Sequence, residues 1–187
     1  ADPADVSRAA AALLAAQRPI IQAGQGVLYA EATEELIELA EFLQAPVMTT
    51  LPGKSAFPEN HPLALGAGGP STTAAVHKYM NWSDLIFGAG CSFVKTFFAV
   101  SIPTGKVMIH ATNDEDAIGR EYNCDFPVLG DAKLVLRQLL EELKNRAGSA
   151  RPVNQALQDD IRSVKQNWLA QWMPKLTSDE TPINLYR

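Results

Sequence analysis

Short apolar runs that alternate with amphipathic segments constrain the fold of this chain more than any other feature. Five runs have the length and apolar content of buried strands: Pro19–Ala23, Pro46–Thr49, Asp84–Gly90, Lys106–His110 and Phe126–Leu129. The segments between them carry apolar residues at helical spacing. This alternation predicts an α/β fold, in which right-handed crossovers join the strands of a parallel sheet. We expect these five strands and a sixth that the pattern does not place.

Helices are expected where capping residues precede apolar residues at helical spacing. Asp2 can cap a helix that has Pro3 at its first position, and Asp131 can cap a later one. In chain order, the expected helices are Pro3–Ala16, Glu31–Gln44, Ser71–Met80, a short turn at Asp114–Gly119, Ala132–Ala147 and a last helix that carries Leu157, Ile161, Val164, Trp168 and Trp172. The last helix either packs back on the core or covers a part of the protein outside this chain.

Composition describes a soluble protein with one well-buried domain and an extension. Of the 187 residues, 47% are hydrophobic and 20% are charged. The net charge of −5, with both signs mixed, disfavours a nucleic-acid-binding surface. No apolar run approaches the roughly 20 residues of a membrane span. Only two cysteines occur, Cys91 and Cys124, which favours the reducing cytoplasm. We therefore expect a cytoplasmic protein without nucleic-acid or membrane partners.

A proline-rich loop follows the strand that ends at Thr49. Pro52, Pro58 and Pro62 each fix a backbone angle and remove a backbone donor, so the loop is expected to be ordered. In doubly wound α/β sheets, ligands bind in a crevice outside the carboxyl ends of the strands. The position of this loop therefore predicts that it borders such a crevice.

Glycines lie at or near the ends of three expected strands or loops. These glycines are Gly24, Gly26, Gly66, Gly68, Gly88 and Gly90. Gathered at one edge of the sheet, they would let a nucleotide diphosphate approach backbone N–H groups. The alternative is that they only allow tight connections between strands and helices, and the sequence leaves both interpretations open.

Asp114 follows the strand that ends near His110, and it has two possible roles. An acidic residue at the start of a helical turn is favoured by the helix dipole. An acidic residue soon after a strand is also where dinucleotide-binding folds hold a ribose hydroxyl. These two interpretations remain open.

The other reactive side chains do not form an evident catalytic or metal site. His61, His77 and His110 are scattered and lack a metal-ligand spacing. Cys91 has no identifiable activating partner, so it is interpreted as a small apolar residue at a strand end. We predict neither catalytic residues nor a metal site in this chain.

The run Ala-Pro-Val-Met-Thr-Thr-Leu-Pro-Gly-Lys-Ser-Ala-Phe-Pro-Glu-Asn-His-Pro at residues 45–62 resembles a known family. It is similar to the central domain of thiamine-diphosphate-dependent enzymes of the acetolactate synthase type, which include pyruvate oxidase, oxalyl-CoA decarboxylase and benzoylformate decarboxylase. Further landmarks of the family follow in order at Ser83–Gly90, Ile109-His110 and Phe126–Asp131. The resemblance covers about Pro19 to Asp131.

The resemblance implies a doubly wound, Rossmann-like, six-stranded parallel sheet that lies between two thiamine-binding domains. Residues 1–147 would form the central domain. Residues 148–187 would be a linker and a C-terminal helix that leads to a thiamine-diphosphate-binding domain. The flanking domains of the same polypeptide would hold thiamine diphosphate and Mg²⁺. The whole enzyme would be a cytoplasmic, homo-oligomeric lyase or transferase for 2-keto acids or acyloins, and this chain alone would be inactive.

In this family the central domain carries FAD in some members, ADP in others and no nucleotide in many. The residues that the resemblance implies for cofactor binding are Gly24, Gly26, Gly66, Gly68, Gly88, Gly90 and Asp114. Ser92 replaces an arginine of the flavin-binding members, and Thr112 replaces their first aspartate. Each loss would weaken FAD binding by about 1–3 kcal/mol. We therefore expect a domain that binds a nucleotide weakly or not at all; the alternatives are a stand-alone FAD-, ADP- or NAD-binding module and a structural oligomerisation domain.

Overall fold

Six parallel strands form one sheet in the computed structural model, which describes residues 1–69 and 72–184. The strand order is β3-β2-β1-β4-β5-β6. The strands are β1 (Pro19–Ala23), β2 (Val47–Thr50), β3 (Ala64–Gly68), β4 (Leu85–Ala89), β5 (Val107–Thr112) and β6 (Phe126–Leu129). This order is that of a doubly wound α/β fold, and it confirms the predicted fold class.

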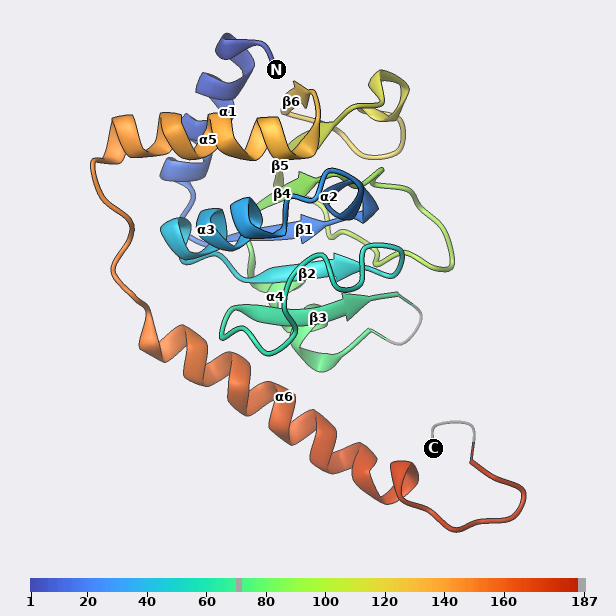
Figure 1. Cartoon of the computed structure of the whole chain (residues 1–187). Coiled ribbons are helices and arrows are strands. Elements are labelled where there is room, and N and C mark those ends of the chain that lie inside the picture. Colours follow the sequence, from blue (N-terminus) through green and yellow to red (C-terminus); the bar gives the residue numbers. More distant parts are fainter. Residues whose placement is uncertain (70–71, 185–187) are drawn as a thin grey trace.

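The helices connect the strands and cover both faces of the sheet (Figure 1). They are α1 (Pro3–Ala15), α2 (Gln25–Tyr29), α3 (Thr33–Leu43), α4 (Ala74–Trp82), the 3₁₀ helix η1 (Glu115–Ala117), α5 (Ala132–Ala147) and α6 (Gln155–Leu176). Helices α1 and α3 both pack against α5, whereas α4 packs against β3 and α6. Figure 1 shows α3 in front of the sheet and α4 behind it.

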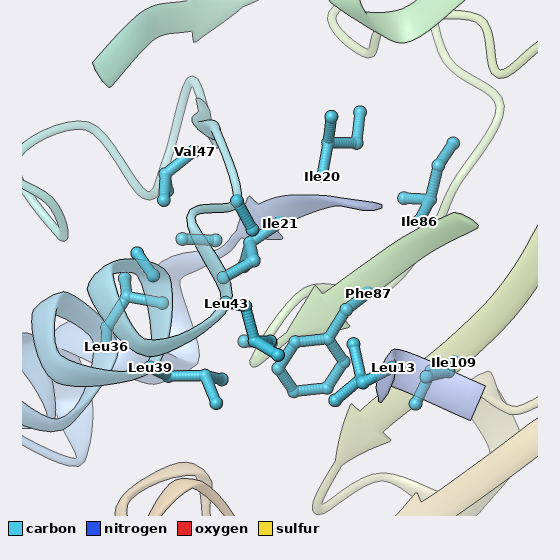
Figure 2. Packing of buried hydrophobic residues seen from close by; sticks show 14 of the residues in the cluster. Leu13, Ile20, Ile21, Leu36, Leu39, Leu43, Val47, Ile86, Phe87 and Ile109 are labelled. Atoms are coloured by element: carbon cyan, nitrogen blue, oxygen red, sulfur yellow. The ribbon is translucent and has the colours of Figure 1, made fainter. Parts of the chain in front are cut away.

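The core lies where α1 and α3 meet the middle of the sheet. Figure 2 shows Leu13 of α1 and Leu43 of α3 beside the aromatic ring of Phe87, a residue of β4. All three side chains are fully buried. Every residue of β1 and β4 is buried, because helices cover both faces of these central strands.

The strand order reverses between β1 and β4. From β1 the chain continues to β2 and β3 on one side, and it then crosses back to β4, β5 and β6 on the other side. Pro19 pairs with Leu85 and Ala23 pairs with Ala89, so the two central strands end level with each other. Loops that leave them diverge, and a crevice opens at this point in folds of this order.

The sixth strand, which the sequence pattern did not place, is β3 at the edge of the sheet. Its sequence is Ala-Leu-Gly-Ala-Gly, and glycine lacks a side chain that would favour a strand. Residues Gly66 and Gly68 therefore lie within a strand rather than in a turn. Pairing with β2 stabilises this segment although its own propensity is low.

Several helix bounds differ from the predictions. Helix α3 begins at Thr33 rather than Glu31, because Glu31 adopts a positive φ of 51° in the preceding turn. Helix α2 was not expected. Helix α4 begins at Ala74, after the cap Thr73, and continues to Trp82. Ser71, the expected start of this helix, lies outside the described residues.

The caps predicted for two helices are present. Asp2 accepts a hydrogen bond from the N–H of Ala4 at the start of α1, and Asp131 accepts one from the N–H of Leu134 at the start of α5. Helix α5 has the predicted bounds. Each cap pairs an N–H group that a helix leaves unsatisfied at its start.

The first half of α6 packs back on the domain. Ile161 is buried, and the Lys165 ammonium donates to the carbonyl oxygens of Glu59 and Ala64, which lie at the β3 edge. Leu169 and Met173, further along the helix, are 46% and 43% exposed. The helix therefore contacts the domain with one half and projects away from it with the other (Figure 1).

Candidate functional site

A crevice of about 360 Å³ lies at the carboxyl ends of the central strands. Its walls come from the ends of β1, β2, β3 and β5, from α2, and from the loop after β4. It lies beside the reversal between β1 and β4, where doubly wound folds bind ligands. The loop predicted to border it contributes Pro52 to its wall. We therefore treat this crevice as the candidate site.

A larger hollow of about 640 Å³ lies on the other side of the loop after β4. Residues 95–106 and 121–123 form most of its wall. Lys95 lies over the ring of Tyr122, with its ammonium 4.6 Å from the ring centroid. No buried polar side chain lines this hollow among the described residues, so it offers less to a specific ligand than the crevice does.

Gly24, Gly26, Gly53 and Gly90 form a cluster beside the crevice that we call the glycine junction. A Cβ atom at Gly24 would overlap the carbonyl oxygen of Gly90, and one at Gly26 would lie 2.8 Å from the Gly90 Cα. A Cβ atom at Gly53, in the proline-rich loop, would lie 2.7 Å from the carbonyl carbon of Gly24. Three chain segments therefore touch through their backbones, which only glycine permits here.

The N–H groups of the glycine junction have partners within the protein. Gly24 donates to the carbonyl oxygen of Ala89, Gly26 to that of Gly90, and Gly90 to that of Ala111, each at 2.9 Å. Gly53 donates to the carbonyl oxygen of Thr50. These donors extend the sheet and its turns, so they are not directed at a ligand.

Two further glycines make room for side chains of the loop that follows β4. A Cβ atom at Gly88 would overlap the Phe93 ring, and one at Gly68 would overlap a methyl group of Val100. Both side chains also line the crevice. The loop therefore fills space above β3 and β4 with its own apolar groups.

Gln22 of β1 lines the crevice and was missed by the sequence analysis. Only 6% of its surface is exposed, and its Oε1 has no hydrogen-bond partner among the described residues. The signal that would have found it is a polar residue inside the apolar run Pro19–Ala23. A buried amide oxygen without a partner lowers the stability of the fold. Its presence in this wall of the crevice therefore calls for an explanation.

Asp114, which follows β5, caps η1. Its carboxylate accepts from the N–H of Asp116, while its own N–H donates to the Thr112 hydroxyl. The predicted short helical turn is thus confirmed, with Asp114 at its cap. Asp114 also lines the crevice, so both of its proposed roles remain compatible with its position.

His110 and Cys91 form a buried pair, and Cys91 also contributes to the wall of the crevice. The His110 Nε2 donates to the Cys91 carbonyl oxygen at 2.7 Å, and the imidazole lies 4.7 Å from the Phe93 ring. Burial lowers the pKa of His110, and burial raises the pKa of the Cys91 thiol to about 12. A neutral imidazole and a protonated thiol are suited to packing rather than to nucleophilic chemistry.

The other histidines lie apart from the crevice. His61 is in the proline-rich loop, where its Nε2 lies 3.2 Å from a carboxylate oxygen of Glu41 and its ring contacts Phe57. His77 is exposed on α4. No group of three or more histidine, cysteine, aspartate or glutamate side chains could hold a metal ion within the described ranges.

No helix in the described part of the chain is long and apolar enough to span a membrane.

The family model described as thiamine pyrophosphate enzyme, central domain, matches residues 6–139. The chain belongs to this family. The resemblance read from residues 45–62 is thereby confirmed, and the matched range covers the whole sheet.

Curated relatives of this thiamine pyrophosphate enzyme domain are large subunits of acetolactate synthases. The chain is 42% identical over 144 residues to a probable acetolactate synthase large subunit of Methanocaldococcus jannaschii, with 75% of this chain and 24% of the relative covered. It is 34% identical over 170 residues to the isozyme 3 large subunit of Escherichia coli, with 89% and 28% covered. The chain thus spans about a quarter of the length of these relatives.

Solved structures also resemble the domain. Benzoylformate decarboxylase from Polynucleobacter necessarius superposes with a TM-score of 0.66 and 25% identity, over 82% of this chain and 28% of that chain. The match supports the six-stranded α/β fold as the fold of the family.

The structure brings together only some of the residues predicted for cofactor binding. Gly26, Gly68, Gly90 and Asp114 line the crevice, whereas Gly24, Gly66 and Gly88 are not among its lining residues. Gly66 has a positive φ of 98° within β3. The assignment of these seven residues to a cofactor stays a prediction.

The crevice does not fit the diphosphate of FAD or ADP. No lysine or arginine lines it in the described ranges, and the one acidic residue in its described wall is Asp114. The N–H groups of Gly24, Gly26 and Gly90 already donate to carbonyl groups. A diphosphate bound there would therefore find no lysine or arginine in the described wall, and the N–H groups of these three glycines would not be free to bind it.

Proposed function

We propose that this chain is the non-catalytic central domain of a thiamine-diphosphate-dependent lyase or transferase of the acetolactate synthase type, acting on 2-keto acids or acyloins. The match of residues 6–139 to the central-domain model carries this proposal. The chain also spans only about a quarter of its acetolactate synthase relatives. Residues 1–147 would be the domain itself, and residues 148–187 a linker and helix that lead to a thiamine-binding domain.

Thiamine diphosphate and Mg²⁺ would be held by flanking domains of the same polypeptide. When bound, the cofactor supplies a carbon nucleophile and an electron sink for the keto carbon. The residues of this chain would position those domains in a cytoplasmic, homo-oligomeric enzyme.

The attachment of the linker supports a positioning role. The Arg151 guanidinium donates to the carbonyl oxygens of Leu13, Leu14 and Ala16, which end α1. Its backbone N–H donates to the carbonyl oxygen of Phe42 in α3. Because Arg151 is fixed to two helices, the chain leaves the domain in a defined direction. A domain that holds a neighbouring domain in a fixed orientation needs a linker that leaves it in a fixed direction.

A domain exchange tests the proposal. Residues 6–139 of this chain would replace the matching segment in the Methanocaldococcus jannaschii relative, and acetolactate formation from pyruvate would be measured with thiamine diphosphate and Mg²⁺. We expect a folded chimera that retains activity, while the 187-residue chain alone shows none. A matched chimera with Gly24→Val should lose activity through misfolding.

Two outcomes would contradict the proposal. One is a chimera that is folded by circular dichroism and holds thiamine diphosphate but forms no acetolactate. The other is turnover of pyruvate by the isolated chain, since that would place catalytic residues within it.

A further inference from the structure

Helix α6 is held to the domain by less apolar surface than α5 is. Ile161 is the only buried residue of α6, a helix that lies wholly within the described range, and Leu157 and Val164 pack beside it partly buried. Along α5, by contrast, six residues are buried in the described chain. Elements with few buried apolar contacts open locally at a lower free energy than the core does. We therefore expect α6 to leave the domain before the sheet unfolds.

Polar contacts fasten α6 to α4. The Tyr79 hydroxyl of α4 donates to the Asp160 carboxylate of α6 at 2.5 Å, and the Lys78 ammonium donates to the two oxygens of the same carboxylate at 2.6 and 2.7 Å. The bonds from Lys78 and Tyr79 hold the pKa of Asp160 below its usual value. Tyr79 is only 2% exposed, so its hydroxyl is a donor at a fixed place. Hydrogen bonds to an ionised group are stronger than neutral ones, and this contact therefore fixes α6 on α4.

One turn further along α6, Lys165 binds the edge of the sheet. Its ammonium donates to the carbonyl oxygens of Glu59 and Ala64 at 3.1 and 3.2 Å. Ala64 is the first residue of β3, the edge strand, and α6 packs beside α4 and β3 (Figure 1). Burial lowers the pKa of Lys165, because the ammonium gives up part of its hydration there. An edge strand presents backbone groups that its sheet leaves unpaired, and the docked helix covers some of them.

A short exposed segment separates α6 from the part of the linker that is fixed to the domain. Arg151 is bound to α1 and α3, and Asn154 is the cap of α6. Pro152 and Val153, between these two residues, are exposed. Rotation about this segment moves α6 and leaves Arg151 in place. The chain therefore has a hinge next to a weakly buried helix.

We propose that α6 is a strap that opens from the domain as a unit, with the contact among Asp160, Tyr79 and Lys78 as its latch. In the closed state, the latch and Lys165 hold α6 against α4 and β3. In the open state, the sheet stays folded, the latch groups are hydrated and the β3 edge is uncovered. This inference goes beyond the proposed function, because it concerns the docking of α6 within this chain and does not depend on thiamine chemistry.

Hydrogen–deuterium exchange of the 187-residue chain, followed by mass spectrometry, tests whether α6 opens separately. The conditions are chosen so that the exchange rate follows the opening equilibrium. We expect the amides of residues 159–168 to exchange more slowly than in an unstructured peptide, yet at least about tenfold faster than those of residues 135–147 in α5. Exchange of α6 at the rate of α5, or without any protection, overturns the proposal.

Matched variants test the latch. Asp160→Ala removes the acceptor and should speed the exchange of α6 at least about tenfold, while Tyr79→Phe removes one donor and should speed it at least about threefold. Asp159→Ala is the control, because Asp159 is the preceding residue of the same helix and accepts only from Gln155 and Arg162, in α6 itself, among the described hydrogen bonds. It should leave the excess of the α6 rate over the α5 rate nearly unchanged.

Two results overturn the assignment of the latch. One is that Asp160→Ala speeds the exchange of α6 no more than Asp159→Ala does. The other is that Asp160→Ala speeds the exchange of α6 and α5 by the same factor, since α6 would then open only when the whole domain unfolds.

Discussion

The glycine junction and the crevice lie side by side at the carboxyl end of the sheet, yet they are built in opposite ways. In the junction, Gly24, Gly26 and Gly53 bring three backbones into contact and satisfy their N–H groups internally. In the crevice, side chains leave open volume, and the Gln22 amide keeps an unpaired oxygen. The N–H groups of the junction glycines thus serve the protein's own backbone, whereas Gln22 lies in the crevice wall with a buried oxygen that has no partner in the described part of the chain.

The comparison shows that a glycine-rich turn after a strand does not by itself identify a nucleotide site. In phosphate-binding turns, the glycines let a ligand approach unpaired N–H groups. Here the same lack of side chains lets Gly90 and Gly26 approach each other. The partners of the N–H groups distinguish the two uses, and these partners are visible only in the structure.

The largest effect is expected from adding one methyl group to the glycine junction. Gly24 has an ordinary φ of −104°, so Gly24→Ala adds no backbone strain, but its Cβ would overlap the Gly90 carbonyl oxygen. We expect a loss of about 3 kcal/mol in the free energy of unfolding, measured by urea denaturation.

Gly105→Ala is the control for this variant. Gly105 has a positive φ of 79° but nothing within 4 Å of its Cβ position, so we expect a cost of about 1–2 kcal/mol from the backbone alone. If Gly24→Ala costs no more than Gly105→Ala, the junction is not closely packed.

A smaller effect is expected from pH, through the buried His110 of β5. Burial lowers the pKa of His110 below 6.5 and outweighs the hydrogen bond to Cys91 and the charge of Asp114, which act in the opposite direction. The unfolded chain therefore binds a proton first as the pH falls. Stability is complete above pH 6.5 and falls below it, by at most about 1.4 kcal/mol per pH unit.

Urea denaturation between pH 5 and 8, a range that spans the ordinary pKa of histidine, checks this prediction. His110→Gln retains an N–H donor but does not titrate, so it should reduce the slope below pH 6.5. His77→Gln, at an exposed position on α4, should leave the slope unchanged. Equal slopes in the wild type and in His110→Gln would contradict this account.

The smallest effect is expected at the unpaired acceptors themselves. Gln22→Leu and Thr49→Val each remove a buried oxygen that lacks a described partner. Without added ligand, each should raise the free energy of unfolding by about 1 kcal/mol, as seen in thermal or urea denaturation. A destabilised Gln22→Leu would indicate that the amide already has a partner in the protein.

The sequence predicted the sheet well because buried parallel strands leave a strong apolar signal. Strands β1 and β6 have the predicted bounds, and β4 is one residue shorter than predicted at each end. Strand β3 escaped prediction because Gly66 and Gly68 weaken its local signal, and only pairing with β2 reveals it. Local residue preferences therefore predicted five strands, including the edge strand β6, whereas the other edge strand, β3, depends on its pairing with β2.

The candidate site was predicted less completely than the fold. Gly26, Gly68, Gly90 and Asp114 were expected at the crevice and do line it. Gln22 was missed, since one polar residue in an apolar strand looks tolerable until its missing partner is known. The roles of the glycines also could not be resolved, because packing and ligand approach favour the same residue at the same place.

The most direct test of the central claim is to follow the amide signals of Gly24, Gly26 and Gly90 by nuclear magnetic resonance while ADP is added. We predict no saturable shift of these three signals up to about 1 mM ADP, because each N–H already donates to a carbonyl group. Saturable shifts of all three signals at micromolar ADP would contradict the account and show that the glycine junction binds phosphate.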